Sequence, residues 1–515
     1  MDRLIQDVGL LLNSTIENAK TKLAIVPGSQ IVLRYIGSSY QNDPARSVLE
    51  LLLLLFAVRY FLASKYSYTK QNYVKLGEDE IDELVDDWTP EPLVRDLDDS
   101  EKWELDSVPV VKGRNGPVVS VSTGEGTFDN LINLNSTDVY GISNDAEAIE
   151  QAVTTVRGYG VGSCGPAGFY GNQDAHVNCE KTIAEFLGTE GCILYSQAFA
   201  TLSSVIPCFM KRGDVIVADT KVNLAIQKGM QLSRASLFWY EHNDMESLED
   251  ALKRANKSYR RGPLPRRFII SEGLYENNGT SPNLAKIVEL KKKYKYRLLL
   301  DESYSLGVLG STGRGLPEEL GIDRSEIDIT TGSLAFAFGA AGGFCAGSNT
   351  MVEHQRITSL AYTFSATMPP FLANTSSFVI RRLTASNSPV TALRTKAELL
   401  YDTLSATNRN SKKPVLDILS RRGSPVIVLQ IPKEVLMRLD QENSPRAVSE
   451  DRLLQDIVDI VRNDGVHIGR FNRLESSEIF PVDYTVRVVA NAQLSDDQII
   501  SAAQIIARGF ARRLE

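Results

Sequence analysis

The residues best placed to do chemistry lie in the middle of this 515-residue chain. Residues 159–176, YGVGSCGPAGFYGNQDAH, form a glycine-rich loop whose backbone can approach a phosphate or another loop closely. The carboxylate of Asp301 directly follows the apolar run LLL. Ligands of open α/β sheets bind at the carboxyl ends of strands, so a side chain in that position is a candidate for binding. The glycine-rich loop alone is weak support, because buried loop crossings use glycine in the same way.

Metal, dithiol and nucleic-acid chemistry are not favoured by the composition. The five cysteines lack any CxxC spacing and the four histidines are far apart, so we expect no metal site and a reducing compartment. The formal net charge is −8, whereas proteins that bind nucleic acids usually carry an excess of basic residues. We therefore predict that neither a metal nor a nucleic acid is a partner.

Beyond about residue 110, short apolar runs alternate with segments of helical period. This alternation predicts an α/β fold in which helices cover a mostly parallel sheet. We divide this part into a large domain, residues 111–385, and a smaller C-terminal α+β domain, residues 386–515. The strands expected in the two domains are residues 215–218, 268–271, 297–301, 327–332, 425–429 and 485–490, and the closing helix is residues 496–513.

The N-terminal part predicts contact with a membrane. Residues 47–63, SVLELLLLLFAVRYFLA, are about as long as the shortest segments that span a bilayer, and Glu50 and Arg59 can reach toward headgroups. We expect a transmembrane helix here, with a buried or interfacial helix as the alternative. Residues 1–46 are expected to form an amphipathic, membrane-proximal segment without a signal peptide.

Residues 64–110 are predicted to be an acidic linker. Between Gly77 and Ser107, fourteen acidic residues stand against only two basic ones, and Pro90 and Pro92 interrupt the segment. We expect an extended, solvated strap. The basic residues on either side of residues 47–63 favour a cytosolic position for the body.

A series of motifs in a fixed order gives the chain its family resemblance. The glycine-rich loop is followed by VADTKVNLAIQKG, SEGLYENNGTSP, LLLDESYSLGVLGSTGRG, TTGSLAFAFGAAGGFCAG and FSATMPP. Over roughly residues 110–515 this series resembles that of the α-oxoamine synthases. The glycine-rich loop, DWTPEPL and the N-terminal part resemble more narrowly the non-catalytic subunits of fungal serine palmitoyltransferases. The resemblance implies the fold type I of pyridoxal-phosphate (PLP) transferases.

The resemblance places the PLP-anchoring lysine of the family at a position where this chain has Phe336. The family segment is like GTFSKAFG, and residues 332–339 here are GSLAFAFG. A phenyl ring has no amine to form a Schiff base, and no lysine occurs between Lys295 and Lys396. We therefore expect no catalytic residue in this chain. The alternative of a wrong alignment is disfavoured by the GAAGGFCAG that follows directly.

Other positions also depart from the family pattern. Asn223 replaces the family's ring-stacking histidine, and Tyr304 replaces a second histidine that contacts the cofactor. Ala198 replaces a phosphate-binding glycine, and Glu276 replaces a serine. We expect the charge of Glu276 to repel a phosphorylated cofactor. Asp301 matches the carboxylate that keeps the PLP ring nitrogen protonated, so it is a vestigial cofactor residue, with a structural role in a turn as the alternative.

Two segments could instead serve a partner, because the family forms dimers with shared active sites. Ser365 and Thr367 in FSATMPP match hydroxyl residues that reach the neighbour's cofactor phosphate, and turn capping is the alternative. Cys164 is expected near the shared substrate pocket, where it could favour serine over alanine or glycine, and simple packing is the alternative. Arg487 matches an arginine that lies near the substrate carboxylate in the catalytic members of the family.

The resemblance implies a required, non-catalytic subunit of a heterodimer. Its lysine-bearing partner, the second long-chain-base subunit, would hold PLP covalently and condense L-serine with palmitoyl-CoA to 3-ketosphinganine. We expect the endoplasmic reticulum membrane, a body facing the cytosol, and a small activating subunit and membrane regulators as further partners. Two alternatives stay open: a regulatory membrane scaffold that docks the catalytic chain, and an independently active PLP acyltransferase.

Overall fold

The computed structural model describes most of the chain in two compact units, Met1–Asp96 and Leu97–Glu515. The described residues are scattered positions between 29 and 41, and then 43–62, 77–258, 264–410, 414–442, 449–471, 473–474 and 476–514. Most of the amphipathic segment predicted within residues 1–46, and residues 63–76 of the span and linker, lie outside this set. The domain boundaries at residues 110 and 385 stay predictions.

In the first unit, helix α3 (Pro44–Leu62) covers nearly all of the predicted span. Its apolar side chains are exposed on all sides, with Phe56 at 69% and Phe61 at 79%. Among the described residues, however, no helix combines the length and the apolar character needed to cross a membrane. The predicted transmembrane helix is therefore not confirmed.

The acidic linker is not the extended strap that its charge suggested. It contains two short helices, α4 (Glu78–Asp86) and α5 (Asp99–Ser107). Both begin with a capping interaction: the Glu80 carboxylate accepts from the Gly77 amide at 2.7 Å, and Glu101 accepts from the Asp98 amide at 2.9 Å. Acidic side chains at a helix N-terminus are stabilised by the free amides and by the helix dipole, which explains why this acidic composition folds locally.

A seven-stranded sheet forms the centre of the second unit, with the strand order β4-β10-β9-β8-β7-β5-β6. Strands β5 to β9 pair in parallel, and β10 pairs antiparallel with both of its neighbours. The strands are β4 (Gly191–Tyr195), β5 (Val215–Asp219), β6 (Ser236–Tyr240), β7 (Arg267–Glu272), β8 (Arg297–Asp301), β9 (Ile329–Ser333) and β10 (Gly343–Gly347). The four strands predicted in this region are thereby confirmed.

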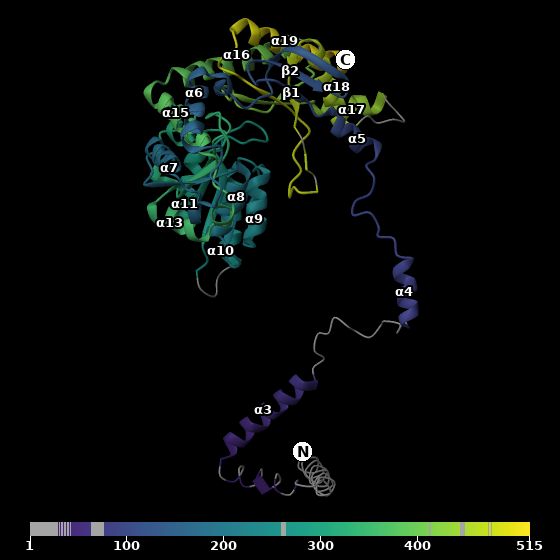
Figure 1. Ribbon diagram of the computed structural model, residues 1–515, viewed down its shortest axis with the longest axis vertical. Helices are drawn as coiled ribbons and strands as arrows, with labels where there is room; N and C mark the ends of the chain where they lie inside the picture. The colour runs from purple at the N-terminus through teal and green to yellow at the C-terminus, as the bar shows by residue number, and fades with distance from the viewer. Residues whose placement is uncertain are drawn as a thin grey trace. The chain divides into compact units, whose positions relative to one another are not determined.

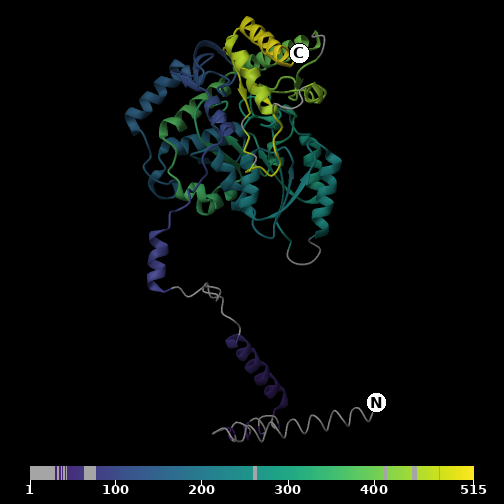
Figure 2. The same ribbon diagram turned by 90° about the vertical axis from the view of Figure 1, so that its right-hand side faces the viewer.

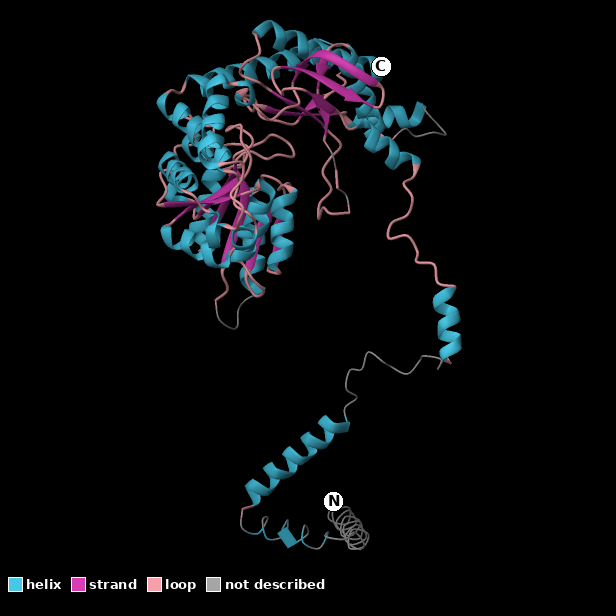
Figure 3. Ribbon diagram, in the orientation of Figure 1, coloured by secondary structure: helices cyan, strands magenta, loops and turns pink. Residues whose placement is uncertain are grey.

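Helices cover both faces of this sheet (Figures 1 and 3). Along β8, Leu298 and Leu300 belong to one buried cluster and Leu299 to another, because successive side chains of a strand point to opposite faces. The helices around the sheet are α6 (Ala146–Tyr159), α7 (Asp174–Leu187), α8 (Ala198–Phe209), α9 (Leu224–Ser233), α10 (Met245–Ser258), α11 (Leu284–Tyr294), α12 (Leu316–Glu319), α13 (Asn349–Thr358), α14 (Leu360–Phe364) and α15 (Pro370–Ala385).

Two four-stranded sheets, with orders β1-β2-β3-β13 and β11-β12-β15-β14, make up the rest of the second unit. Their strands are β1 (Val110–Lys112), β2 (Val118–Thr123), β3 (Gly126–Asn133), β11 (Asp417–Ile418), β12 (Val426–Gln430), β13 (Val466–His467), β14 (Gly469–Arg470) and β15 (Val486–Val489). The accompanying helices are α16 (Ser388–Asn410), α17 (Lys433–Glu442), α18 (Glu450–Asn463) and α19 (Asp496–Leu514). The parallel pairing of β13 with β3 joins the N-terminal strands to the C-terminal part of the chain.

The loop that follows β14 ties these smaller sheets to the large one. Phe480 packs edge-on against Trp239 of β6, with ring centroids 4.8 Å apart. Nearby, Lys221 Nζ lies 2.6 Å from the Asp483 carboxylate. Figures 1 and 2 show this yellow loop extending toward the teal helices of the large sheet. The loop thus fixes the position of β15 relative to the edge of the large sheet where the candidate site lies.

Candidate functional site

Three carboxylates gather at the edge where the parallel strands end. Asp219, Glu272 and Asp301 are the last residues of β5, β7 and β8. Glu272 is paired in register with Asp301, and Asp301 with Thr331 of β9. This is the edge at which α/β sheets bind ligands, so the sequence-based placement of Asp301 is confirmed.

Asp301 is almost completely buried and fully hydrogen-bonded. Ser303 Oγ and Thr331 Oγ1 each donate to Oδ1 at 2.9 Å, and the Asn223 amide donates to Oδ2 at 3.3 Å. Burial raises the pKa of Asp301 to about 6, and the three donors oppose that rise. Asn223 itself caps α9 by accepting from the Ile226 amide at 3.0 Å. In this chain Asn223 therefore holds both a helix end and the buried carboxylate.

Glu272 was missed in the sequence, although it ends a strand just as Asp301 does. Its carboxylate accepts from the backbone amides of Asn223 at 2.6 Å and Glu276 at 3.2 Å. Burial, with the nearby carboxylates Asp301 and Glu276, raises the pKa of Glu272 well above its usual range. A protonated Glu272 would relieve the repulsion at this crowded edge.

Phe336 lies in the loop between β9 and β10, with only 3% of its surface exposed. Its ring centroid lies 4.8 Å from that of Tyr304, with the planes tilted by 53°. A Cβ atom on Gly307 would lie 2.4 Å from Ala337 Cβ, so the backbone at Gly307 packs closely against the loop that carries Phe336. The position that the resemblance assigns to a lysine is thus filled by packed aromatic side chains.

Glu276 stands between two positively polarised groups. The Tyr304 phenol donates to Glu276 Oε1 at 2.8 Å, and Arg487 Nη1 from β15 reaches the same oxygen at 3.3 Å. Burial raises the pKa of the Tyr304 phenol, so it stays protonated as the donor. The expected repulsion of a phosphate by Glu276 has to be revised, because Arg487 compensates the carboxylate charge.

These side chains do not fit PLP held covalently by this chain. An aldehyde needs an amine, whereas Phe336 offers a buried phenyl ring. The guanidinium that could have met a substrate carboxylate, Arg487, is already paired with Glu276. The retained part is the buried Asp301 with its three donors, which is compatible with the structural role considered for it.

The glycine-rich loop and the FSATMPP segment lie against each other. The Thr367 amide donates to the Gly165 carbonyl at 3.0 Å, and Ser163 Oγ donates to the Thr367 carbonyl at 2.7 Å. Pro166 and Ala366 form an isolated antiparallel bridge. No hydrogen bond among the described residues joins Ser365, Thr367 or Cys164 to Asp301 or Phe336.

The three predicted partner-directed residues differ in their surroundings. The Ser365 side chain is exposed, whereas Thr367 Oγ1 is buried without a hydrogen-bond partner among the described residues. Cys164 is exposed and has a left-handed backbone with φ of 58°, a conformation that costs energy for a residue with a side chain. Gly171 closes this loop, since a Cβ there would lie 1.9 Å from the Gly165 carbonyl oxygen.

Large apolar side chains are exposed on both of these segments. Phe169 and Tyr170, in the π-helical turn η2 (Ala167–Gly171), are 69% and 74% exposed. In and beside α14, which packs on this turn, the exposed apolar residues are Ile357, Leu360 and Phe364. A cluster of this kind typically marks a surface that contacts another macromolecule.

Comparison with known proteins identifies the family. The model of the family "Aminotransferase class I and II" matches residues 129–506. Serine palmitoyltransferase 1 of Saccharomyces cerevisiae is 36% identical, covering 94% of this chain and 92% of the yeast protein. Long chain base biosynthesis protein 1 of Arabidopsis thaliana is 39% identical, covering 78% and 81%. This chain belongs to the serine palmitoyltransferase subunit 1 family.

Solved structures show the fold of this family member. Serine palmitoyltransferase from S. paucimobilis superimposes with a TM-score of 0.67 at 20% identity, covering 79% of this chain and 93% of the bacterial one. The 8-amino-7-oxononanoate synthase of Francisella tularensis gives a TM-score of 0.57 at 21% identity, covering 73% and 97%. The predicted α/β fold of PLP transferases is therefore confirmed for this serine palmitoyltransferase subunit 1 homologue.

Proposed function

We propose that the chain is a required, non-catalytic subunit of serine palmitoyltransferase. Its lysine-bearing partner condenses L-serine with palmitoyl-CoA to 3-ketosphinganine, releasing carbon dioxide and CoA. The observation that carries this proposal is Phe336, buried against Tyr304 in a stretch of sequence without lysine from residue 296 to residue 395. PLP, bound covalently by the partner, supplies the electron sink for the chemistry.

In this proposal the chain completes its partner's site with the segments around Cys164 and Thr367. The exposed Ser365 hydroxyl is available to donate to the partner's cofactor phosphate; Thr367 Oγ1 has no hydrogen-bond partner among the described residues but is buried in the isolated chain, so it donates only once the partner reshapes this surface. Cys164, beside the same segment, limits the room for the amino-acid side chain. The exposed Phe169, Tyr170 and Phe364 support a protein partner on this face, because a free surface of this kind is costly in water.

We further propose that the complex resides at the endoplasmic reticulum membrane with its body in the cytosol, together with a small activating subunit and membrane regulators. The support is α3, whose leucine and phenylalanine side chains are exposed on all sides. A long-chain acyl-CoA and its product partition to the bilayer surface, so an enzyme held there gains local substrate concentration.

The deciding experiment compares this chain alone, the partner alone and the co-purified complex, each in detergent. We expect turnover of L-serine and palmitoyl-CoA only in the complex, and PLP on the partner polypeptide after borohydride reduction and mass spectrometry. Reduced PLP on this chain, or turnover by this chain alone, would contradict the proposal and favour an independent acyltransferase.

A second experiment separates site completion from mere docking. Ser365→Ala and Thr367→Val should weaken retention of PLP by the complex roughly five-fold or more, because each removes a hydrogen bond to a dianionic group. Thr391→Ala in α16 removes an exposed hydroxyl elsewhere and should leave retention unchanged. Equal retention in all variants, with assembly intact, would favour the regulatory scaffold.

A further inference from the structure

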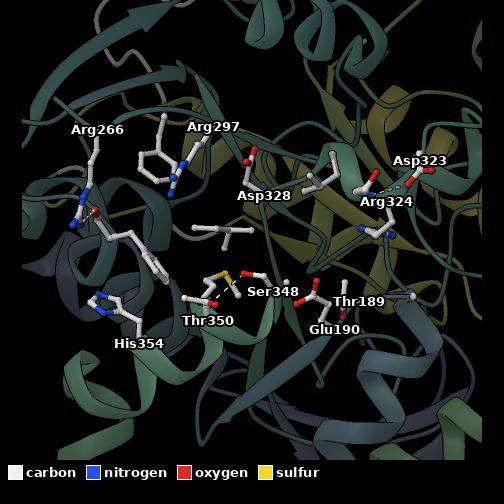
Figure 4. A pocket seen from close by; sticks show the side chains of 18 residues that line it. Thr189, Glu190, Arg266, Arg297, Asp323, Arg324, Asp328, Ser348, Thr350 and His354 are labelled. Atoms are coloured by element: carbon white, nitrogen blue, oxygen red, sulfur yellow. Dashed lines mark hydrogen bonds between the residues drawn. The ribbon is translucent and has the colours of Figure 1, made fainter. Parts of the chain in front are cut away.

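A hollow of about 830 Å³ lies at the edge of the large sheet opposite to Asp301. It opens where β7, β8 and β9 begin and where β10 ends, and residues of α8 and α13 also line it. Its volume is in the range of small-molecule sites. Phe268, Ile329 and Met351 provide apolar lining, and the polar residues around them are drawn in Figure 4.

The strand register directs two arginines to the same face of the sheet. Arg297 of β8 is paired in register with Phe268 of β7, and Arg266 precedes Phe268 by two residues. Side chains at positions i and i+2, and those paired across neighbouring strands, share a face. Phe268 packs in the buried cluster with Phe209 and Met351, so Arg266 and Arg297 flank that cluster at its open end.

The carboxylates of the hollow already have partners within the protein. Asp328 accepts from Lys291 Nζ at 2.6 Å and from the Leu298 amide at 2.8 Å. Glu190 accepts from the Asn349 amide at 3.0 Å, and Asp323 from the Ser325 amide at 2.8 Å. At the same end as Asp323, the buried Glu302 compensates the charge of Arg324 at 3.2 Å, whereas Glu190 and Asp323 keep their negative charges.

The two arginines at the other end are not neutralised. Arg266 Nη1 donates to the Phe209 carbonyl at 2.9 Å, and its guanidinium has no ion-pair partner among the described residues, although its backbone amide donates to Asp214 Oδ1 at 2.9 Å. Arg297 makes neither a hydrogen bond nor an ion pair within the described part of the chain. His354 stands at this end too, with its ring 5.4 Å from that of Phe209. In the view of Figure 4, Arg266, Arg297 and His354 lie toward one end, and Glu190, Asp323 and Arg324 toward the other.

We infer that this hollow binds a phosphate monoester. Two guanidiniums with free donors suit the several acceptor oxygens of a phosphate dianion, which an arginine fork can bind with paired hydrogen bonds. The exposed Thr350 hydroxyl adds a further donor, whereas His354 Nε2 already donates to the Cys208 carbonyl at 3.3 Å. The volume beyond the arginines leaves room for the organic part against Phe268 and Ile329. This site is distinct from the cofactor edge and does not depend on the proposed function.

Calorimetric titration of the co-purified complex tests the site with three probes: inorganic phosphate, adenosine 5′-monophosphate, and dihexanoyl phosphatidic acid below its micelle concentration. We expect at least one of the two monoesters to bind more tightly than inorganic phosphate. A preference for the nucleotide indicates a soluble ligand, and a preference for the short-chain lipid indicates a lipid headgroup.

The variants Arg297→Ala and Arg266→Ala should each weaken that binding roughly ten-fold or more, since each removes charge-assisted hydrogen bonds. Arg297→Lys keeps the positive charge but not the paired donors of the guanidinium, so it should weaken binding less than Arg297→Ala does. Arg114→Ala, an exposed arginine between β1 and β2, is the matched control and should bind normally. Assembly and the thermal midpoint of each variant establish that it is folded. Absence of binding by both monoesters, or equal affinity in every variant, overturns the inference.

Discussion

The phenol of Tyr304 donates a 2.8 Å hydrogen bond to Glu276, on the same carboxylate oxygen that Arg487 reaches at 3.3 Å. Tyr304 follows β8, Glu276 follows β7, and Arg487 belongs to β15 of a smaller sheet. The contact therefore joins two sheets at the edge where a PLP transferase would hold its cofactor. In this chain that edge is organised by interactions of the protein with itself.

Replacing Tyr304 by phenylalanine tests how much this contact stabilises the fold. We expect Tyr304→Phe to lower the free energy of unfolding by roughly 1 kcal/mol. This is below the usual range for hydrogen bonds to charged groups, because Arg487 still pairs with Glu276, which is 27% exposed. The measurement is chemical denaturation of the purified complex. Tyr401→Phe in α16, whose hydroxyl makes no hydrogen bond among the described residues, should have a smaller effect, and equal effects would contradict the assignment.

The buried Asp301 predicts a particular dependence of stability on pH. Its pKa is about 6 in the folded chain and near 3.8 when unfolded, so the native state binds more protons between these values. Its contribution to stability is therefore fully present below about pH 4 and is lost as the pH rises through 6. The stability difference between the native protein and Asp301→Asn should shrink by roughly 2 kcal/mol from pH 4 to pH 7.

The control for that experiment is Asp402→Asn. The hydrogen bond from Arg422 lowers the pKa of Asp402, which gives the opposite sign: its contribution is present at neutral pH and is lost in acid. Denaturation curves measured at several pH values decide the matter. Parallel pH profiles for the native protein and Asp301→Asn would show that Asp301 does not titrate as described.

The sequence predicted those features that depend on neighbouring residues. Strand β8 begins and ends where its apolar pattern predicted, because buried parallel strands are continuous apolar runs. Charge alone misled the prediction for the acidic linker, where the capping side chains Glu80 and Glu101 start two helices. The contact of Glu276 with Arg487 spans 211 residues of sequence, so no local pattern could have revealed it.

Gly171→Ala tests whether the glycine-rich loop must pack on the FSATMPP segment. A methyl group at this position would lie 1.9 Å from the Gly165 carbonyl oxygen, so the backbone has to move and the bridge between Pro166 and Ala366 is strained. We expect turnover by the co-purified complex to fall roughly ten-fold or more, which corresponds to an increase of about 1.4 kcal/mol in the activation free energy. Gly162→Ala lies in the same loop with open space around its Cβ and should behave like the native chain. The same loss in both variants would show that the loop tolerates no substitution at all, whatever its packing.

Phe336→Lys is predicted not to create a second active site. The new amine would lie beside the Tyr304 ring, among side chains that burial keeps from water, and Arg487 would remain paired with Glu276. An amine in the right place is only one requirement, because the substrate carboxylate also needs a partner and Arg487 is already paired with Glu276. We therefore expect no internal-aldimine absorbance on this chain. The assay uses the complex with the partner's own catalytic lysine replaced, so that any aldimine must belong to this chain, and Phe336→Leu beside a native partner should turn over at nearly the native rate. A borohydride-reducible aldimine on the Phe336→Lys chain would mean that the edge still binds PLP, and the chain would then have lost only its lysine.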